Sequence, residues 1–458
     1  MKRKIILCLM SIAILLGGCT TEETKVTPMT QRTAGKMEKE PVIEYTVPDC
    51  APGILINQAG YRTEDRKIAI FRGNTLPAVF RVHDAKTGAV VQEGSLEIKG
   101  EDKITGEQIG YADFSKVQAP GEYYLKSDIL GYSYTFSIGD KIFEELFDRN
   151  LKSLYEKTQD IDTLSGEEIC RTSKAVMNML LAYEMHKTAF DDHAGINDSG
   201  NGIPDVVDVL LSQILLLAKQ EETVLSSTEW EMVSYYASAM AKFSYTYKEF
   251  DNAYATSCLQ LADSIWRYME KNAGQVEEKF CFMTATELYR ASGEGKYHRY
   301  IEEFCQNRKE AVTSVREEVY GAITYIATKQ RVDVDICTVF MKEIMNEAED
   351  IAAQAKNSFY QVDGSVSQEN NEEILWDMVV LTVVDYVIAN HEYAMIIENH
   401  LHYLLGRNSM AISYMDGVGE REYSAREGQQ SIMDGGFMES ALLFMLSEIN
   451  DKEETEEE

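Results

Sequence analysis

The chain has 458 residues and a formal net charge of −32, with 45% apolar and 26% charged residues. Its length is sufficient for two or three domains, and its composition is typical of a soluble globular protein. The strong negative charge argues against nucleic acid as a partner, because phosphates would be repelled. It says little about the substrate, since much of that charge belongs on a solvated surface.

Residues 1–18 have the pattern of an export signal. Residues 2–4 are basic, and the apolar run at residues 5–16 is too short to be a good membrane span. The run ends in Leu-Gly-Gly-Cys at residues 16–19, which resembles a bacterial lipobox. That resemblance implies cleavage before Cys19, lipidation of its thiol, and a protein exported and lipid-anchored to the bacterial cell membrane or surface. The alternative is an ordinary signal peptide whose cysteine is incidental.

Residues 19–53 have the composition of a polar linker, rich in Thr, Glu, Lys and Pro. Such a linker would hold the folded part away from the membrane. The remaining cysteines show no zinc-ligand spacing, and several lie in apolar helical runs where we expect buried thiols. They are Cys50, Cys170, Cys258, Cys281, Cys305 and Cys337.

Residues 54–139 are predicted to be all-β. Short strand-like runs occur at residues 68–71, 78–82, 89–91 and 123–125, and turn residues separate them. Short strands at this spacing favour a small β-sandwich.

Residues 140–450 are predicted to be helical. Val176, Met179, Leu180 and Tyr183 lie on one helical face, and residues 376–387 repeat the same period. About a dozen helical stretches separated by short loops fit six helical hairpins that close a barrel. The chain ends in an acidic run, residues 451–458, which we predict to be a disordered tail.

The stretch at residues 196–220 is the most informative part of this helical region. Turn-forming residues occupy positions 197–202, and Pro204 follows where a first helical turn accepts proline. Asp205 and Asp208 then place negative charge at the start of an apolar helix, where the helix dipole favours it.

The resulting motif, N-G-I-P-D-x-x-D, resembles glycoside hydrolase family 9, whose members are mostly endo-β-1,4-glucanases built on an (α/α)6 barrel. Further matches follow in the same order, at residues 285–297, 401–408 and 413–419. Residues 56–61, I-N-Q-A-G-Y, with residues 111–115 and 121–125, resemble the immunoglobulin-like domain that precedes many of these barrels. The resemblance implies an immunoglobulin-like β-sandwich followed by an all-α (α/α)6 barrel, with a β-glucan oligo- or polysaccharide as partner. We expect no cofactor, and no set of metal ligands can be traced residue by residue in the sequence.

The catalytic motifs of that family are altered in this chain. The family's base lies in G-G-W-[YH]-D-A-G-D-Y-G-K-Y, just before a helix that reads L-L-A-Y-E. The helix is present at residues 180–184, but Arg171 occupies the base position and Glu168 that of the earlier aspartate. A guanidinium stays protonated and cannot accept a proton. The family's acid lies in N-E-V-x-x-D-W-N-A, and here Asp434 takes its position, unless it is a turn or cap residue.

Other candidate site residues give weaker signals. The family's H-x-R element is replaced by residues 420–430, in which Arg421 or Arg426 offers a substitute. His400 and His402 are the closest histidine pair, and they make a poor metal site. Aromatic side chains at helical spacing belong more often to a core than to a sugar groove. The tryptophans concerned are Trp230, Trp266 and Trp376.

Three functions are compatible with these observations. The first is a β-1,4-glucan hydrolase acting by inversion, with Glu167 or Glu168 as an unconventional base and Asp434 as acid. The second is a non-catalytic relative that binds glucan. The third is a structural lipoprotein. The loss of both catalytic motifs favours the second over the family's chemistry.

Overall fold

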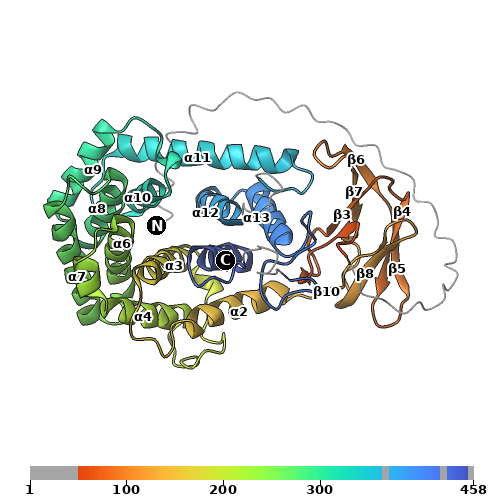
Figure 1. Cartoon of the computed structure of the whole chain (residues 1–458), viewed down its shortest axis with the longest axis horizontal. Coiled ribbons are helices and arrows are strands. Elements are labelled where there is room, and N and C mark those ends of the chain that lie inside the picture. The colour runs from red at the N-terminus through yellow and green to blue at the C-terminus, as the bar shows by residue number, and fades with distance from the viewer. Residues whose placement is uncertain (1–49, 364–370, 423–430, 452–458) are drawn as a thin grey trace, which may run out of the picture.

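The computed structural model of the chain describes residues 50–363, 371–422 and 431–451. Within these ranges, the strands lie between residues 54 and 138, and helices follow from residue 142. Figure 1 shows the strands gathered at one side of the molecule and the helices filling the other. The predicted fold class, an immunoglobulin-like β-sandwich followed by an (α/α)6 barrel, is confirmed. The predicted signal segment, Cys19, Arg426 and residues 452–458 lie outside the described residues.

Two sheets form the sandwich. One has the strand order β1-β3-β7-β6, and the other has the order β2-β10-β8-β4-β5, with β9 paired to β8. In β4, Phe80 and Val82 are buried while Val79 and Arg81 are less so, which is the period-two pattern of a strand with one face on the core. The bounds are β1 Ile54–Leu55, β2 Gly60–Tyr61, β3 Ile68–Gly73, β4 Val79–Asp84, β5 Val90–Ser95, β6 Glu97–Glu101, β7 Gln108–Asp113, β8 Gly121–Ser127, β9 Gly131–Tyr132 and β10 Phe136–Ile138.

The helices form a double ring. The inner ring consists of α3 Gly166–Met185, α6 Trp230–Tyr247, α8 Glu278–Ser292, α10 Arg316–Ala327, α12 Asn371–Ile388 and α14 Phe437–Asn450. The outer ring consists of α2 Ile142–Glu156, α4 Asp205–Ala218, α7 Asn252–Lys271, α9 Gly295–Asn307, α11 Val334–Asn357 and α13 His391–Leu404. Short connections include α5 Glu221–Leu225 and the 3-10 turns Lys187–Ala189 and Val312–Ser314.

The inner and outer helices differ in how many of their side chains are buried. In α14, ten consecutive residues from Met438 to Ser447 are buried, so this inner helix is covered on every side. In outer helix α7, by contrast, the buried residues recur three or four positions apart, as in Cys258, Ala262 and Ile265. Helix α3 also differs from the single apolar face expected at Val176–Tyr183, because all eight residues in that range are buried.

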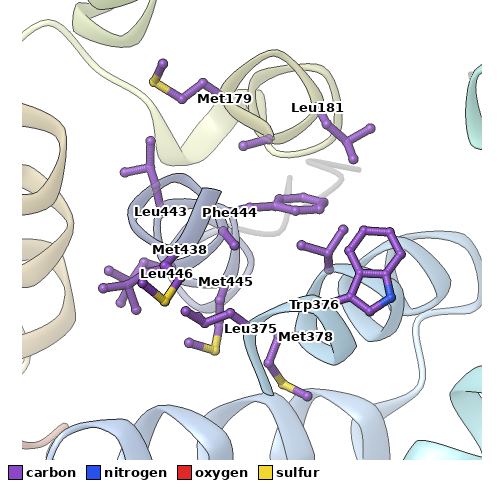
Figure 2. Close-up of a cluster of buried hydrophobic side chains, with 14 of the residues drawn as sticks. Met179, Leu181, Leu375, Trp376, Met378, Met438, Leu443, Phe444, Met445 and Leu446 are labelled. Carbon is purple, nitrogen blue, oxygen red and sulfur yellow. The ribbon is translucent and has the colours of Figure 1, made fainter. Parts of the chain in front are cut away.

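The inner helices meet in an apolar core that fixes their spacing. Figure 2 shows α14 side chains, with Phe444 among them, between residues of α3 such as Leu181 and residues of α12 such as Leu375. Phe444, Leu375 and Met179 have no exposed surface. Because protein interiors are close-packed, this core fixes the spacing between the inner helices.

Gln58 joins the sandwich to the barrel. Its Nε2 donates to the carbonyl of Ala411 at 2.9 Å, and its Oε1 accepts the backbone N–H groups of Glu420 and Arg421, each at 2.9 Å. Its own N–H donates to the carbonyl of Leu405 at 2.8 Å. Gly419 has a φ of +91°, and a Cβ there would lie 2.7 Å from the Gln58 side chain. A side chain at residue 419 would therefore collide with this link.

Neighbouring residues extend the same interface. Asn57 Nδ2 lies 3.0 Å from His402 Nδ1, and the rings of Tyr61 and His402 are 4.9 Å apart. Arg407 is fully buried and donates to Asn399 Oδ1 at 2.7 Å. The motifs at residues 56–61 and 401–419, which carry much of the family resemblance, therefore meet each other at the domain interface.

Candidate functional site

The amino-terminal turns of the inner helices lie at one end of the barrel, which we call the amino-end face (Figure 1). It includes Arg171 and Lys174 of α3, Trp230, Glu231 and Tyr235 of α6, Lys279 of α8, Arg316 and Glu317 of α10, Trp376 of α12, and Phe437 of α14. Contacts between different helices establish the grouping. Lys174 pairs with Glu231 at 2.6 Å, and the Arg316 guanidinium lies 5.0 Å from the centre of the Phe437 ring.

Glu168 begins helix α3 as a capping residue. Its carboxylate accepts the N–H and the hydroxyl of Ser165, each at 2.8 Å, and Ser165 Oγ accepts the Glu168 N–H in return. These bonds stabilise the ionised form, and they hold the pKa of Glu168 below its ordinary value. A catalytic base at neutral pH needs a pKa near the working pH, so this environment does not favour Glu168 in that role.

Arg171 lies on the next turn of α3. One guanidinium nitrogen is 3.9 Å from Glu168 Oε1, and 43% of the side chain is exposed. The Arg171 stem packs against the backbone of residue 436, where a Cβ in place of the Gly436 hydrogen would lie 2.3 Å from its Cγ. The Arg171 stem therefore lies beside residue 436, two positions after Asp434, and the start of α14 is next to the second turn of α3.

Asp434 lies just before helix α14. Its Oδ1 accepts the N–H groups of Gly436 at 2.9 Å and Glu439 at 3.2 Å, which leaves it tied to the helix start. Glu167, the other acid considered as a base, is exposed on the first turn of α3. Catalysis by Glu167, Glu168 or Asp434 stays a prediction.

Glu439 is the most buried carboxyl group of this region, and it lies on the first turn of α14. Its Oε2 accepts from Lys157 Nζ at 2.6 Å and from the N–H of Gly435. Burial raises its pKa, against the opposing effect of Lys157. With no exposed surface, Glu439 holds the turn before α14 rather than facing solvent.

Ion pairs connect the helices around the amino-end face. Arg316 of α10 pairs with Glu372 and Glu373 of α12, the latter at 2.7 Å. Tyr235 of α6 donates to Glu317 of α10 at 3.1 Å, and Tyr320 of α10 donates to Asn178 of α3. Sequence reasoning missed these residues, although each acid and base lies near a helix start, where polar side chains in an otherwise apolar helix give a detectable signal.

The three tryptophans have different positions. Trp266 is buried on outer helix α7 and contacts Tyr297 and Tyr300, so it belongs to the core. Trp376 is 7% exposed, with Arg316 above its ring at 5.5 Å. Trp230 is half-buried at the start of α6 and packs on Tyr268. Trp230 is therefore the tryptophan with the most accessible surface on the amino-end face.

The remaining candidates lie away from this face. The backbone of Arg421 binds Gln58 at the domain interface. His400 Nε2 accepts the N–H of Asp363, its Nδ1 bonds the carbonyl of Ile396, and burial lowers its pKa to about 4. His402 is buried against Asn57. Within the described ranges, no group of three or more His, Cys, Asp or Glu residues is arranged to hold a metal ion.

The pKa of Asp377 of α12 is raised well above the ordinary value of an aspartate. Burial is the main cause, followed by a hydrogen bond to Asp363 and the nearby charges of Glu373 and Glu347. Because Glu347 belongs to α11, and Asp363 is bonded to His400 of α13, this carboxyl pair lies toward the outer ring. It offers no proton donor beside Arg171.

A β-sandwich docked on a six-hairpin barrel defines the class of protein as cellulase-like. The sequence model named cellulase N-terminal ig-like domain matches residues 49–131, and the model named glycosyl hydrolase family 9 matches residues 212–427. The chain therefore belongs to glycosyl hydrolase family 9 and carries the immunoglobulin-like domain.

Individual relatives are distant. A cellodextrinase of Butyrivibrio fibrisolvens is 23% identical over 479 residues, which cover 81% of this chain and 85% of the relative. A metagenome-derived family 9 endoglucanase structure superposes with a TM-score of 0.73 at 19% identity, covering 87% of this chain and 99% of the other. A family 9 structure from Bacteroides ovatus gives 0.70 at 16% identity, covering 87% and 98%. At these identities the structural likeness concerns the fold.

Proposed function

We propose that this family 9 protein is exported, is held at the membrane by lipid on Cys19, and binds β-1,4-glucan on the amino-end face without hydrolysing it by the family's acid–base mechanism. The family assignment and its cellulase-like relatives support glucan as the partner. The lipobox-like residues 16–19 support the anchor. No helix within the described ranges is long and apolar enough to cross a membrane.

The observation that carries the loss of hydrolysis is Arg171 at the base position. Inversion needs one carboxylate to activate water and one carboxylic acid to protonate the leaving oxygen, about 6.5–9.5 Å apart. A guanidinium performs neither step. The two carboxylates nearest in sequence to the family positions are already engaged, Glu168 with Ser165 and Asp434 with the start of α14.

The remaining chemistry of the face suits binding. Lys174 donates from its ammonium, and the half-buried indole of Trp230 offers an apolar surface. Sugar hydroxyl groups pair with charged donors, and the C–H face of a pyranose packs on an aromatic ring. A titration with soluble glucan tests whether glucan binds to the amino-end face.

Glucan binding is expected to weaken about tenfold, or 1.4 kcal/mol, in Trp230→Ala, because the substitution removes the accessible aromatic surface. Calorimetric titration of the purified chain with soluble β-1,4-glucan measures this. Tyr132→Ala, at a half-buried aromatic residue of the sandwich, is the matched control and should bind as the parent does. Equal binding by all three proteins would contradict the placement of the glucan site on the amino-end face. If the parent does not bind glucan, the structural lipoprotein is the remaining function.

Cys19→Ser is expected to release the protein from the membrane fraction, because the acceptor thiol for the lipid is lost. Fractionation of cells that express the parent and the variant measures this, with Cys50→Ser as control. Cys50 is exposed and lies outside the lipobox, so its substitution should leave the distribution unchanged. Membrane association of Cys19→Ser equal to the parent's would refute the anchor.

A further inference from the structure

The barrel has a second feature at its opposite end, where the inner helices finish. A cavity of about 990 Å³ lies there, which we call the carboxyl-end cavity. Its wall includes Tyr183 and Glu184 of α3, Tyr245 of α6, Arg290 of α8 and Tyr386 of α12. Pockets that bind small molecules span about 300–1,000 Å³, so the volume is sufficient for an oligosaccharide of a few units.

A buried charge network lies beneath this cavity. Lys242, whose side chain is 2% exposed, has its Nζ 3.6 Å from Glu184 and 3.6 Å from Glu287. Tyr245 donates to Glu287 at 2.8 Å and accepts from Lys242 at 3.0 Å, while Arg290 pairs with Glu184. These bonds hold the Glu184, Tyr245 and Arg290 side chains in fixed positions at the wall.

A contribution to folding stability does not by itself explain this buried charge network. Removing charges from water is costly, and replacing a buried ion pair by apolar residues of similar volume is often neutral or stabilising. Burial accordingly lowers the pKa of Lys242. Lys242 and Glu287 lie toward the carboxyl ends of α6 and α8, beside the cavity, whereas the buried acids Glu317 and Glu439 lie at the amino ends of their helices. Fixed polar groups at the wall of a cavity are what a ligand site requires.

The wall favours a neutral ligand with many hydroxyl groups. Helix ends of this polarity present unpaired carbonyls and a partial negative charge, which repel an anion and accept hydrogen bonds from hydroxyls. The wall also carries the cations Arg290, Lys187, Lys248 and Lys329. They are balanced in part, since Arg290 pairs with Glu184 and Lys187 lies 3.4 Å from Glu249.

Aromatic stacking contributes little to recognition at this wall. The Arg290 guanidinium lies 4.5 Å from the centre of the Tyr245 ring, and the Lys187 ammonium lies 5.1 Å from that of Tyr183. Cations therefore already cover one face of each of these rings, and recognition would rest on hydrogen bonds.

We propose that the carboxyl-end cavity is a second ligand site, which takes a short neutral oligosaccharide through hydrogen bonds to Glu184, Arg290 and the helix-end carbonyls. The site is independent of the amino-end face, so it does not rest on the proposed function. Each sugar hydroxyl both donates and accepts, which matches a wall that mixes carbonyls and carboxylates with lysine and arginine donors.

Calorimetric titration of the purified mature chain with cellotetraose tests the site. Glu184→Gln keeps the size of the side chain but removes the charge that orients Arg290, and its affinity is expected to fall at least tenfold. Lys248→Ala, an exposed residue at the cavity rim, is expected to weaken binding in the same direction and still decides the matter if Glu184→Gln does not fold. Lys271→Ala, at the exposed end of α7, controls for the loss of one surface charge.

The outcomes separate the two sites. Loss of binding in the cavity variants, with binding retained in Trp230→Ala, supports the carboxyl-end site and counts against the amino-end site. Two equivalents of bound sugar, one lost with each set of variants, support both. Binding that disappears only in Trp230→Ala overturns the carboxyl-end site and leaves the proposed function intact. No binding by the parent overturns both.

Discussion

Release of reducing ends from soluble β-1,4-glucan by the purified protein is expected to stay at the background rate. General acid–base groups typically contribute about 10²–10⁴-fold each, and the sequence predicts Arg171 and Asp434 at the positions of the family's base and acid. Arg171 stays protonated at the base position, and Asp434 is bound to two N–H groups at the start of α14. A reducing-sugar assay measures the rate.

Two isosteric variants show whether any residual rate is genuine. Glu168→Gln and Asp434→Asn remove the only carboxylates at the aligned family positions, and we expect neither to change the measured rate. Robust release by the parent that both substitutions abolish would overturn the prediction. The protein would then be a hydrolase, with Glu168 as base and Asp434 as acid.

Gln58→Ala is expected to lower the free energy of unfolding by about 3–5 kcal/mol. The substitution removes the side-chain bonds of buried Gln58 to Ala411, Glu420 and Arg421, and it leaves the buried carbonyl of Ala411 and the part-buried N–H groups of Glu420 and Arg421 without these partners. Each unsatisfied buried group costs about 1–3 kcal/mol. Chemical denaturation of the purified protein measures the change.

The control for this prediction is Gln118→Ala. Gln118 is an exposed residue of the same domain and bonds only Glu64 among its described side-chain partners, so the change should stay within about 0.5 kcal/mol. An effect of Gln58→Ala equally small would show that the two domains are held together mainly by other contacts.

Local patterns in the sequence were sufficient for the architecture. The change from period two to period 3.6 near residue 140 separates sandwich from barrel, because alternation and helical spacing are fixed by backbone geometry. The motif at residues 196–208 marked the start of α4, since its turn residues and early aspartates act locally. Asp205, for example, accepts the N–H of Ala194 at 2.6 Å, only eleven residues away.

The sequence by itself determined the fold class and the family, and it predicts Arg171 at the position of the family's base. Only the tertiary structure decided that Gln58 binds residues more than 350 positions later and that Lys242 lies between Glu184 and Glu287. The physical reason is that secondary structure follows from neighbours along the chain. The role of a charged side chain follows instead from burial and from partners that folding brings together, and neither has a local signature.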